Sequence, residues 1–156
     1  VKPPALRVLM VCLGNICRSP TAEAVLRQRL VAHGLDDQVE VDSAGTGGWH
    51  SGEPPDARAQ RHALRRGYDL SRLRARRVED ADFDRFDLLL AMDEDNLAEL
   101  QRLMPVGSRG ELRLFAAAEV PDPYAGAAQG FDNVLDQIEL ACDVLVVDLR
   151  SRLGTS

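Results

Sequence analysis

The sequence has few of the features that mark membrane, secreted or disulfide-rich proteins. It holds only three cysteines in 156 residues, too few and odd in number for the disulfide framework of a small secreted domain. No apolar run approaches the roughly 20 residues needed to span a bilayer, and the short apolar run near the start lacks a cleavage-site pattern. These absences exclude a membrane span and predict a cytoplasmic protein whose cysteines serve chemistry.

An excess of positive charge is also missing. The formal net charge is −6 at pH 7, which argues against a general nucleic-acid binder, although arginines cluster at 58–66 and 72–77. Such clusters are usually solvated helix faces.

Metal-ligand patterns are missing as well. Cys12 and Cys17 have no second Cys or His pair at zinc-ligand spacing. The acidic stretch 80–87 lacks the glycine of a calcium loop and is expected to be a solvated edge. No catalytic role is assigned to the three histidines, His33, His50 and His62. We therefore expect neither a metal nor a cofactor.

Strand and helix patterns alternate along the chain. Apolar runs predict strands at 6–11, 39–43, 86–92 and 111–115. Amphipathic or capped segments predict helices at 21–33, 56–66, 93–104 and 131–150. Asp93, with Asn96 three residues on, is expected to be a helix cap and not a ligand. This order predicts a single α/β domain over residues 1–156, with a four-stranded parallel sheet and helices on both faces. Ligands of such folds bind at the carboxyl ends of strands, so the phosphate-binding loop is sought after the first strand.

That loop reads Cys12-Leu13-Gly14-Asn15-Ile16-Cys17-Arg18-Ser19 and leads into a helix. Backbone N–H groups of a tight loop before a helix converge, and the helix dipole adds positive potential, so an oxyanion binds there without a metal. Gly14 and Asn15 accept the positive φ that such a curl requires. Arg18 adds a planar fork of donors that grips two phosphate oxygens.

Cys12 is the candidate nucleophile, because the same field favours its thiolate beside a bound phosphate. Taken alone, it is as easily a small buried hydrophobe at a strand end. The Cys-x5-Arg spacing, with a strand before it and a helix after it, favours the nucleophile. Ser19 can cap helix N–H groups or donate its hydroxyl to the sulfur. A Walker motif is excluded because no Gly-Lys-Ser/Thr follows the glycine.

The segment Val11 to Pro20, followed by Ala22-Glu23, resembles the signature of the low-molecular-weight protein tyrosine phosphatases. The likeness continues through Asp42-Ser43-Ala44-Gly45-Thr46, 69–77, Ala91-Met92-Asp93 and Asp122-Pro123-Tyr124. It implies that Cys12 forms a phosphocysteine, that Arg18 and the loop residues 13–17 and 19 bind the phosphate, and that no metal is used. It also implies that Asn15 and Ser43 hydrogen-bond to hold the loop in shape.

Asp122 is the candidate general acid. A tyrosine leaves as a phenolate of pKa about 10, and a positioned acid speeds such a step by about 10²- to 10⁴-fold. Pro121 and Pro123 stiffen the loop that carries Asp122. Local sequence alone also permits a simple turn residue, and the resemblance assigns it the roles of acid and then base.

Trp49 and Tyr124 are candidate walls for a phosphotyrosyl ring. Trp49 lies in a Gly- and Pro-rich loop at 44–55 and alternatively pins that loop to the core. Ala125 stands where many family members carry a second aromatic, so we expect a more open pocket on that side.

The resemblance also implies a reversible Cys12–Cys17 disulfide that protects the nucleophile, although Cys17 alternatively only packs against the helix. Cys142, in an apolar stretch of the last helix, is expected in the core.

Three other functions remain open. An arsenate reductase needs resolving cysteines elsewhere, and only Cys142 is left over. A phosphoarginine phosphatase typically has Thr in place of Ile16, whose larger side chain favours an aryl substrate. A non-catalytic redox or phosphate-sensing module would toggle Cys12 and Cys17 and has no use for Asp122. The expected partners are phosphotyrosine proteins or peptides, a cognate tyrosine kinase, and inorganic phosphate or other oxyanions as product-like inhibitors.

Overall fold

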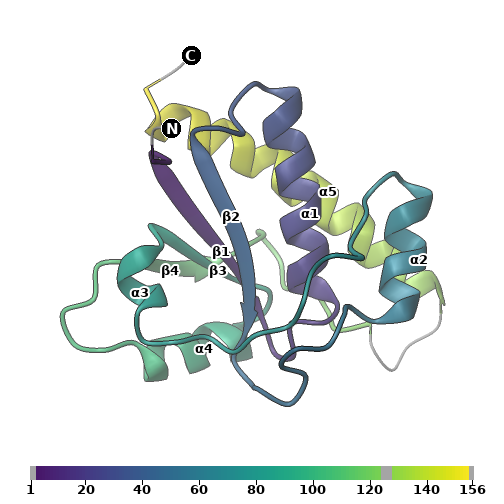
Figure 1. Ribbon diagram of the computed structural model, residues 1–156, viewed down its shortest axis with the longest axis horizontal. Helices are drawn as coiled ribbons and strands as arrows, with labels where there is room; N and C mark the ends of the chain where they lie inside the picture. Colours follow the sequence, from purple (N-terminus) through teal and green to yellow (C-terminus); the bar gives the residue numbers. More distant parts are fainter. Residues whose placement is uncertain (1–2, 124–127, 155–156) are drawn as a thin grey trace.

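The computed structural model describes residues 3–123 and 128–154. In chain order its elements are β1 (Leu6–Cys12), α1 (Arg18–Ala32), β2 (Val39–Gly45), α2 (Ala57–Arg65), α3 (Asp82–Arg85), β3 (Leu88–Ala91), α4 (Glu94–Leu103), β4 (Glu111–Leu114) and α5 (Ala128–Arg152). Figure 1 shows their arrangement. Every strand and helix expected from the sequence is present, with bounds shifted by one to three residues, and the short helix α3 is an addition.

The four strands form one parallel sheet in the order β2-β1-β3-β4, which confirms the predicted fold class. Residues 8–11 of the central strand β1 are fully buried. Because both faces of this strand are covered, its side chains are apolar on both sides, and the sequence shows an uninterrupted apolar run.

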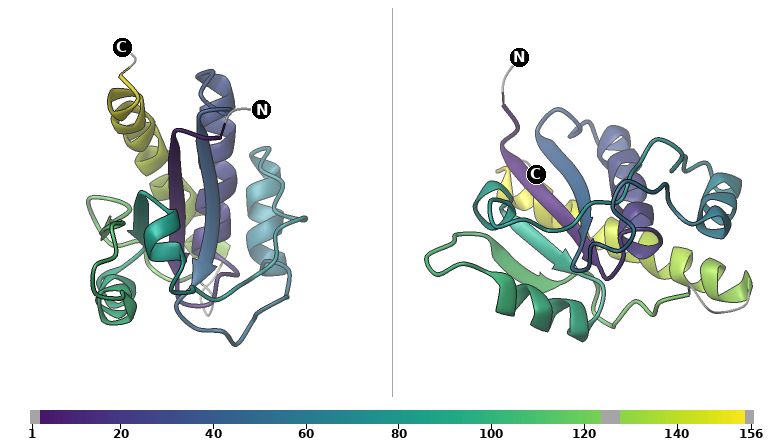
Figure 2. Two further views of the ribbon diagram at one scale, coloured as in Figure 1. Left: turned by 60° about the vertical axis from the view of Figure 1, so that its left-hand side comes forward. Right: turned by 60° about the horizontal axis from the view of Figure 1, so that its bottom comes forward.

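Helices cover both faces of the sheet. Val8 and Met10 of β1 point into the core shared with α1 and α5, which lie side by side (Figure 1). Leu9 and Val11 point the other way, into a second core with Phe86 and the α4 residues. Helix α2 contacts α5 and stands outside the sheet. The loops that follow β1 and β2 therefore meet at the carboxyl end of the sheet (Figure 2).

Helix α5 carries the longest apolar stripe. Its Ile138, Cys142 and Leu149 side chains are fully buried, which confirms the core position expected for Cys142. Among the described residues, neither α5 nor any other helix combines the length and apolar character needed to cross a membrane.

Two local predictions were wrong. Helix α1 begins at Arg18, not at residue 21, because Pro20 sits in the first turn, where a missing N–H costs no helical hydrogen bond. Asp82 is not part of a solvated edge. It is 4% exposed, accepts a hydrogen bond from Arg76 Nη1 at 2.9 Å and so ties α3 to the preceding segment.

Candidate active site

The loop between β1 and α1 is curled at Asn15, which has φ of +57° and is 2% exposed. Asparagine adopts this left-handed conformation more readily than other non-glycine residues, as expected. Gly14 was also expected to need a positive φ and does not. It is small for another reason, since a Cβ there would come 3.1 Å from His50 Cδ2. The curl therefore depends on Asn15.

Side-chain hydrogen bonds fix the loop around the Cys12 sulfur. Asn15 Nδ2 donates to Ser19 Oγ at 2.8 Å, and Ser19 Oγ lies 3.0 Å from Cys12 Sγ. Either the Ser19 hydroxyl or the Cys12 thiol can be the donor in this contact. The Asn15 N–H also points at Cys12 Sγ, at 3.3 Å. The sulfur is thus held by contacts with Asn15 and Ser19.

Ser19 does not cap the helix. The N-cap position of α1 is Cys17, which makes no side-chain capping hydrogen bond. Of the two roles expected for the Ser19 hydroxyl, the structure shows the contact with the sulfur.

Asn15 and Ser43, the two residues expected to hold the loop in shape by hydrogen bonds, have different partners. Asn15 Oδ1 accepts from the Arg76 backbone N–H at 3.0 Å, which connects the loop to the segment after α2. Ser43 Oγ donates to Glu23 Oε1 at 2.7 Å, and so joins β2 to α1. Burial raises the pKa of the Glu23 carboxyl, against the opposing effects of the Ser43 hydrogen bond and the Arg27 charge. Each residue therefore links the surroundings of the loop through its own partner.

Arg18 is 2% exposed and is held from outside the loop. Its Nη1 donates to Asp93 Oδ2 at 2.6 Å and to the Val120 carbonyl at 3.0 Å. Burial alone would lower the pKa of Arg18, but the Asp93 hydrogen bond and the charges of Cys12 and Asp122 outweigh it and raise that pKa. One edge of the guanidinium is fixed by the protein, which orients the rest of the fork.

Asp93 makes this connection from the start of α4. Its Oδ1 accepts from the Asn96 N–H at 2.7 Å, the helix cap expected from the sequence. Its Oδ2 is the partner of Arg18. The cap residue therefore also positions the arginine.

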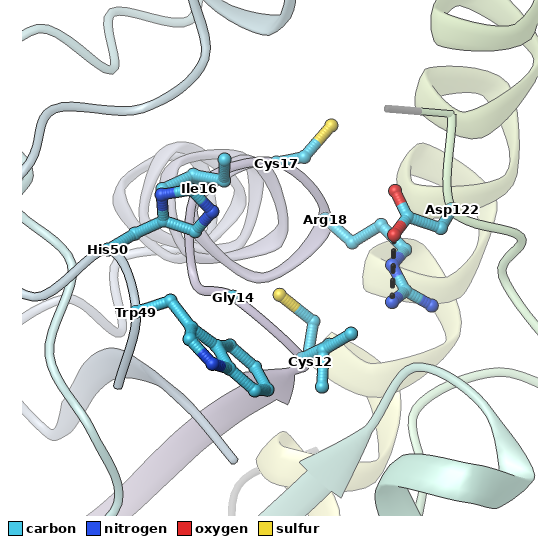
Figure 3. A pocket seen from close by; sticks show the side chains of 9 residues that line it. Cys12, Gly14, Ile16, Cys17, Arg18, Trp49, His50 and Asp122 are labelled. Atoms are coloured by element: carbon cyan, nitrogen blue, oxygen red, sulfur yellow. Dashed lines mark ion pairs between the residues drawn. The ribbon is translucent and has the colours of Figure 1, made fainter. Parts of the chain in front are cut away.

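A cavity of about 110 Å³ opens over the loop, and Figure 3 shows the side chains around it. Asp122 enters from the opposite side to Trp49 and His50. Its Oδ2 lies 3.8 Å from Arg18 Nη2, with the side chain 45% exposed. The lining residues are Cys12, Leu13, Gly14, Ile16, Cys17, Arg18, Trp49, His50 and Asp122. Residues expected from three distant parts of the chain thus meet at one cavity.

Trp49 does not pin its loop to the core, because the residue is 71% exposed. Its ring lies against Gly47, where a Cβ would come within 1.8 Å of a ring carbon. The tryptophan is therefore free to form one wall of a ring slot. Tyr124, the expected opposite wall, and Ala125 lie outside the described residues.

Two residues of the site were missed from the sequence. His50, which was assigned no role, lines the cavity, and its Nδ1 is 2.9 Å from Glu53 Oε2. The available signal was its position next to Trp49 in a loop already expected to reach the site. Asp93 was expected only as a cap, and nothing local in the sequence indicates its contact with Arg18.

Cys17 lines the cavity but is buried beside Ala59 and Phe131. Burial, followed by the charges of Cys12 and Asp122, raises the pKa of the Cys17 thiol well above its ordinary value. In Figure 3 its sulfur points away from that of Cys12. A disulfide between them therefore requires the Cys17 side chain or the loop to move.

No group of three or more His, Cys, Asp or Glu side chains is placed to hold a metal ion in residues 3–123 and 128–154.

Comparison with known proteins places this site in a family. The model of the low molecular weight phosphotyrosine protein phosphatases matches residues 7–154. A low molecular weight protein-tyrosine-phosphatase from Streptomyces coelicolor is 41% identical, over 94% of this chain and 95% of that protein.

Solved structures of tyrosine and arginine phosphatases have the same fold as this chain. A protein tyrosine phosphatase from Entamoeba histolytica, with Hepes in its active site, superposes with a TM-score of 0.89 at 38% identity, over 94% of this chain and 97% of that one. A Drosophila arginine phosphatase superposes with a TM-score of 0.87 at 31% identity, over 93% and 98%.

Proposed function

Since the chain belongs to the low molecular weight phosphotyrosine protein phosphatase family and is a protein tyrosine phosphatase, we propose that Cys12 is its nucleophile, Arg18 its phosphate clamp and Asp122 its general acid. One observation carries the proposal. The Cys12 sulfur, held by Ser19 and Asn15, shares a small cavity with a buried guanidinium and a carboxylate that enters from another loop. We further propose that residues 1–156 act as one phosphatase domain, supported by the family match over 7–154.

In the first step the phosphate dianion binds to the loop N–H groups and to Arg18. The Cys12 thiolate attacks phosphorus as the bond to the aryl oxygen breaks. Asp122 transfers its proton to the departing phenolate oxygen. Phosphocysteine and a free tyrosine side chain result.

In the second step a water attacks phosphocysteine and the Asp122 carboxylate removes its proton. The sulfur–phosphorus bond breaks, and the Ser19 hydroxyl stabilises the returning thiolate from 3.0 Å. Inorganic phosphate leaves, and because it occupies the same donors as the substrate it is expected to inhibit competitively.

The apolar lining favours an aryl substrate. Leu13, Ile16 and Trp49 offer the walls on which a phosphotyrosyl ring packs. The likeness to the Drosophila arginine phosphatase keeps phosphoarginine as a second candidate. Assays of both phosphoamino acids with wild type and Ile16→Thr separate the two. We expect the wild type to prefer phosphotyrosine. We expect phosphoarginine hydrolysis to rise only in Ile16→Thr.

We also propose that Cys17 protects the nucleophile by a reversible disulfide, in a reducing compartment such as the cytoplasm where the Cys12 thiol persists. Because its raised pKa keeps Cys17 a thiol, iodoacetate should alkylate Cys12 first. After peroxide treatment, wild type should recover with dithiothreitol whereas Cys17→Ser should recover much less. Equal recovery of the two proteins would contradict the protective role.

The mechanism is tested by hydrolysis of p-nitrophenyl phosphate and a phosphotyrosine peptide at pH 5 to 7 with EDTA present. We expect the wild type to turn over both substrates and Cys12→Ser to turn over neither. Cys142→Ser, which alters a buried cysteine of α5 that does not line the cavity, is the matched control and should stay active. Turnover by Cys12→Ser near the wild-type rate would refute the cysteine mechanism.

A further inference from the structure

A second and larger cleft adjoins the phosphate cavity. It has a volume of about 400 Å³ and shares Leu13, Arg18, Trp49 and Asp122 with the phosphate cavity. The rest of its lining comes from the first turns of α4 and from Thr46 and Gly47. Because the same four side chains line both spaces, one molecule can reach from the first to the second: a phosphotyrosyl residue together with a neighbouring side chain.

Acidic groups dominate the lining of this cleft. Its carboxylates are Asp93, Asp95, Glu99 and Asp122, against the single guanidinium of Arg18. Asp93 is committed to Arg18 and to the helix cap, and Glu99 pairs with Arg102. Asp95 is exposed, and within the described part of the chain no hydrogen bond or ion pair engages its side chain. At least one carboxylate is therefore available to a ligand.

Asn96 supplies an independent sign of a ligand. It lines the same cleft and is 4% exposed. Its Oδ1 is buried and finds no hydrogen-bond partner among the atoms of the described residues. A buried carbonyl oxygen left without a donor costs free energy, and this oxygen can only accept. The missing partner is therefore an N–H or O–H donor.

A cationic ligand that is rich in donors therefore suits this cleft. The carboxylates of the cleft do not converge as metal ligands within residues 3–123 and 128–154, so a multi-donor group suits them better than a metal ion. A guanidinium offers five N–H groups in a plane and pairs with carboxylate and carbonyl oxygens together.

We propose that this cleft binds the arginine side chain of a phosphotyrosyl substrate that carries arginine within a few residues of the phosphotyrosine. The inference rests on the proposed function and adds a substrate class to it. The arginine donates to Asp95, and to the buried Asn96 Oδ1 once that side chain turns toward the cleft, while the phosphate lies on the Cys12 loop.

The test uses phosphotyrosyl peptides in which one arginine is moved through three positions on either side of the phosphotyrosine. Each is paired with a peptide that has citrulline, an uncharged isostere, at the same position. We expect kcat/KM of the best arginine peptide to exceed that of its citrulline partner about threefold to tenfold, and the ratio to shrink as salt rises.

Two variants localise the effect. Asp95→Asn should bring the arginine-to-citrulline ratio close to one, and Asp95→Lys should favour a glutamate peptide over the arginine peptide. Asp37→Asn makes the same charge change at an exposed site before β2, at the opposite end of the sheet, and should keep the wild-type ratio.

The failures are distinguishable. Equal kcat/KM for arginine and citrulline peptides at every position, with normal hydrolysis of both, would overturn the cleft proposal and leave the phosphatase mechanism standing. An arginine preference that survives unchanged in Asp95→Lys would overturn it as well. If the wild-type protein hydrolyses none of the peptides and no p-nitrophenyl phosphate, both the cleft proposal and the phosphatase mechanism are overturned.

Discussion

The floor and the mouth of the active-site cavity are built in contrasting ways. Cys12, Asn15, Arg18 and Ser19, which form the floor, are each at most 3% exposed. At the mouth, Trp49 is 71% exposed and the Asp122 side chain 45%. The floor is fixed by hydrogen bonds to the cap of α4, to the Val120 carbonyl and to the segment after α2, whereas the mouth comes from two surface loops.

This difference separates two tasks. Buried donors that are already oriented stabilise a phosphoryl transition state without reorganisation, and every phosphomonoester needs them equally. Exposed side chains at the mouth contact the part of the substrate that varies. Changes at the floor should therefore damage chemistry on all substrates, and changes at the mouth should depend on the substrate.

Arg18→Lys, at the floor, should reduce activity more than any single substitution at the mouth. A lysine keeps the charge but cannot reproduce the planar fork, and it leaves Asp93 and the Val120 carbonyl short of donors. We expect kcat/KM to fall about 10³-fold on every substrate, measured by steady-state kinetics, and the Tm to fall too. Activity within tenfold of wild type would show that the fork is not the clamp.

Asp122→Asn should lower the rate of the first step about 10²- to 10³-fold with a phosphotyrosine peptide. The loss should be smaller with p-nitrophenyl phosphate, whose leaving group departs more readily without a proton. Single-turnover measurements on both substrates isolate this step, with Asp37→Asn as control. Equal losses on the two substrates would argue against protonation of the leaving group.

Ser19→Ala should lower kcat about tenfold, because the sulfur loses a donor at 3.0 Å. It also leaves the buried Asn15 Nδ2 without its partner, so the free energy of unfolding should fall by about 1–3 kcal/mol. Steady-state kinetics and urea denaturation measure the two effects. An unchanged kcat in a destabilised protein would limit Ser19 to a structural role.

Trp49→Ala should have the smallest effect on the chemistry. We expect KM for aryl phosphates to rise about fivefold with kcat within about twofold, because the exposed ring contributes uniform binding. Trp49→Phe keeps an aromatic wall and should restore most of the affinity. The free energy of unfolding should stay within about 0.5 kcal/mol of wild type. A large loss of kcat would show that the ring also orients the reacting phosphate.

Much of the fold was predictable because its signals are local. The run at 8–11 is apolar on both faces, as a central strand must be. Gly67, with φ of +90°, follows α2 and ends the helical segment that was predicted at 56–66. Helix α3 was missed because four residues with two aspartates carry no helical pattern. Its position depends on the contact of Asp82 with Arg76, which only the tertiary structure reveals.

The floor of the site was predictable for the same reason, since Cys12 and Arg18 lie in one short loop. The contact of Arg18 with Asp93 spans 75 residues, and no local pattern announces it. The resemblance named Asn15 and Ser43 without their partners, because Arg76 and Glu23 lie 61 and 20 residues away along the chain and only the tertiary structure brings them together.

The central claim, covalent catalysis by Cys12, is tested most directly by trapping the phosphoenzyme. Asp122→Asn is mixed with p-nitrophenyl phosphate, quenched within milliseconds and digested for mass spectrometry. We expect one phosphoryl group on the peptide that contains Cys12, formed with a burst of nitrophenolate and absent in Cys12→Ser. Steady turnover without a burst, or a phosphoryl group on another residue, would contradict it.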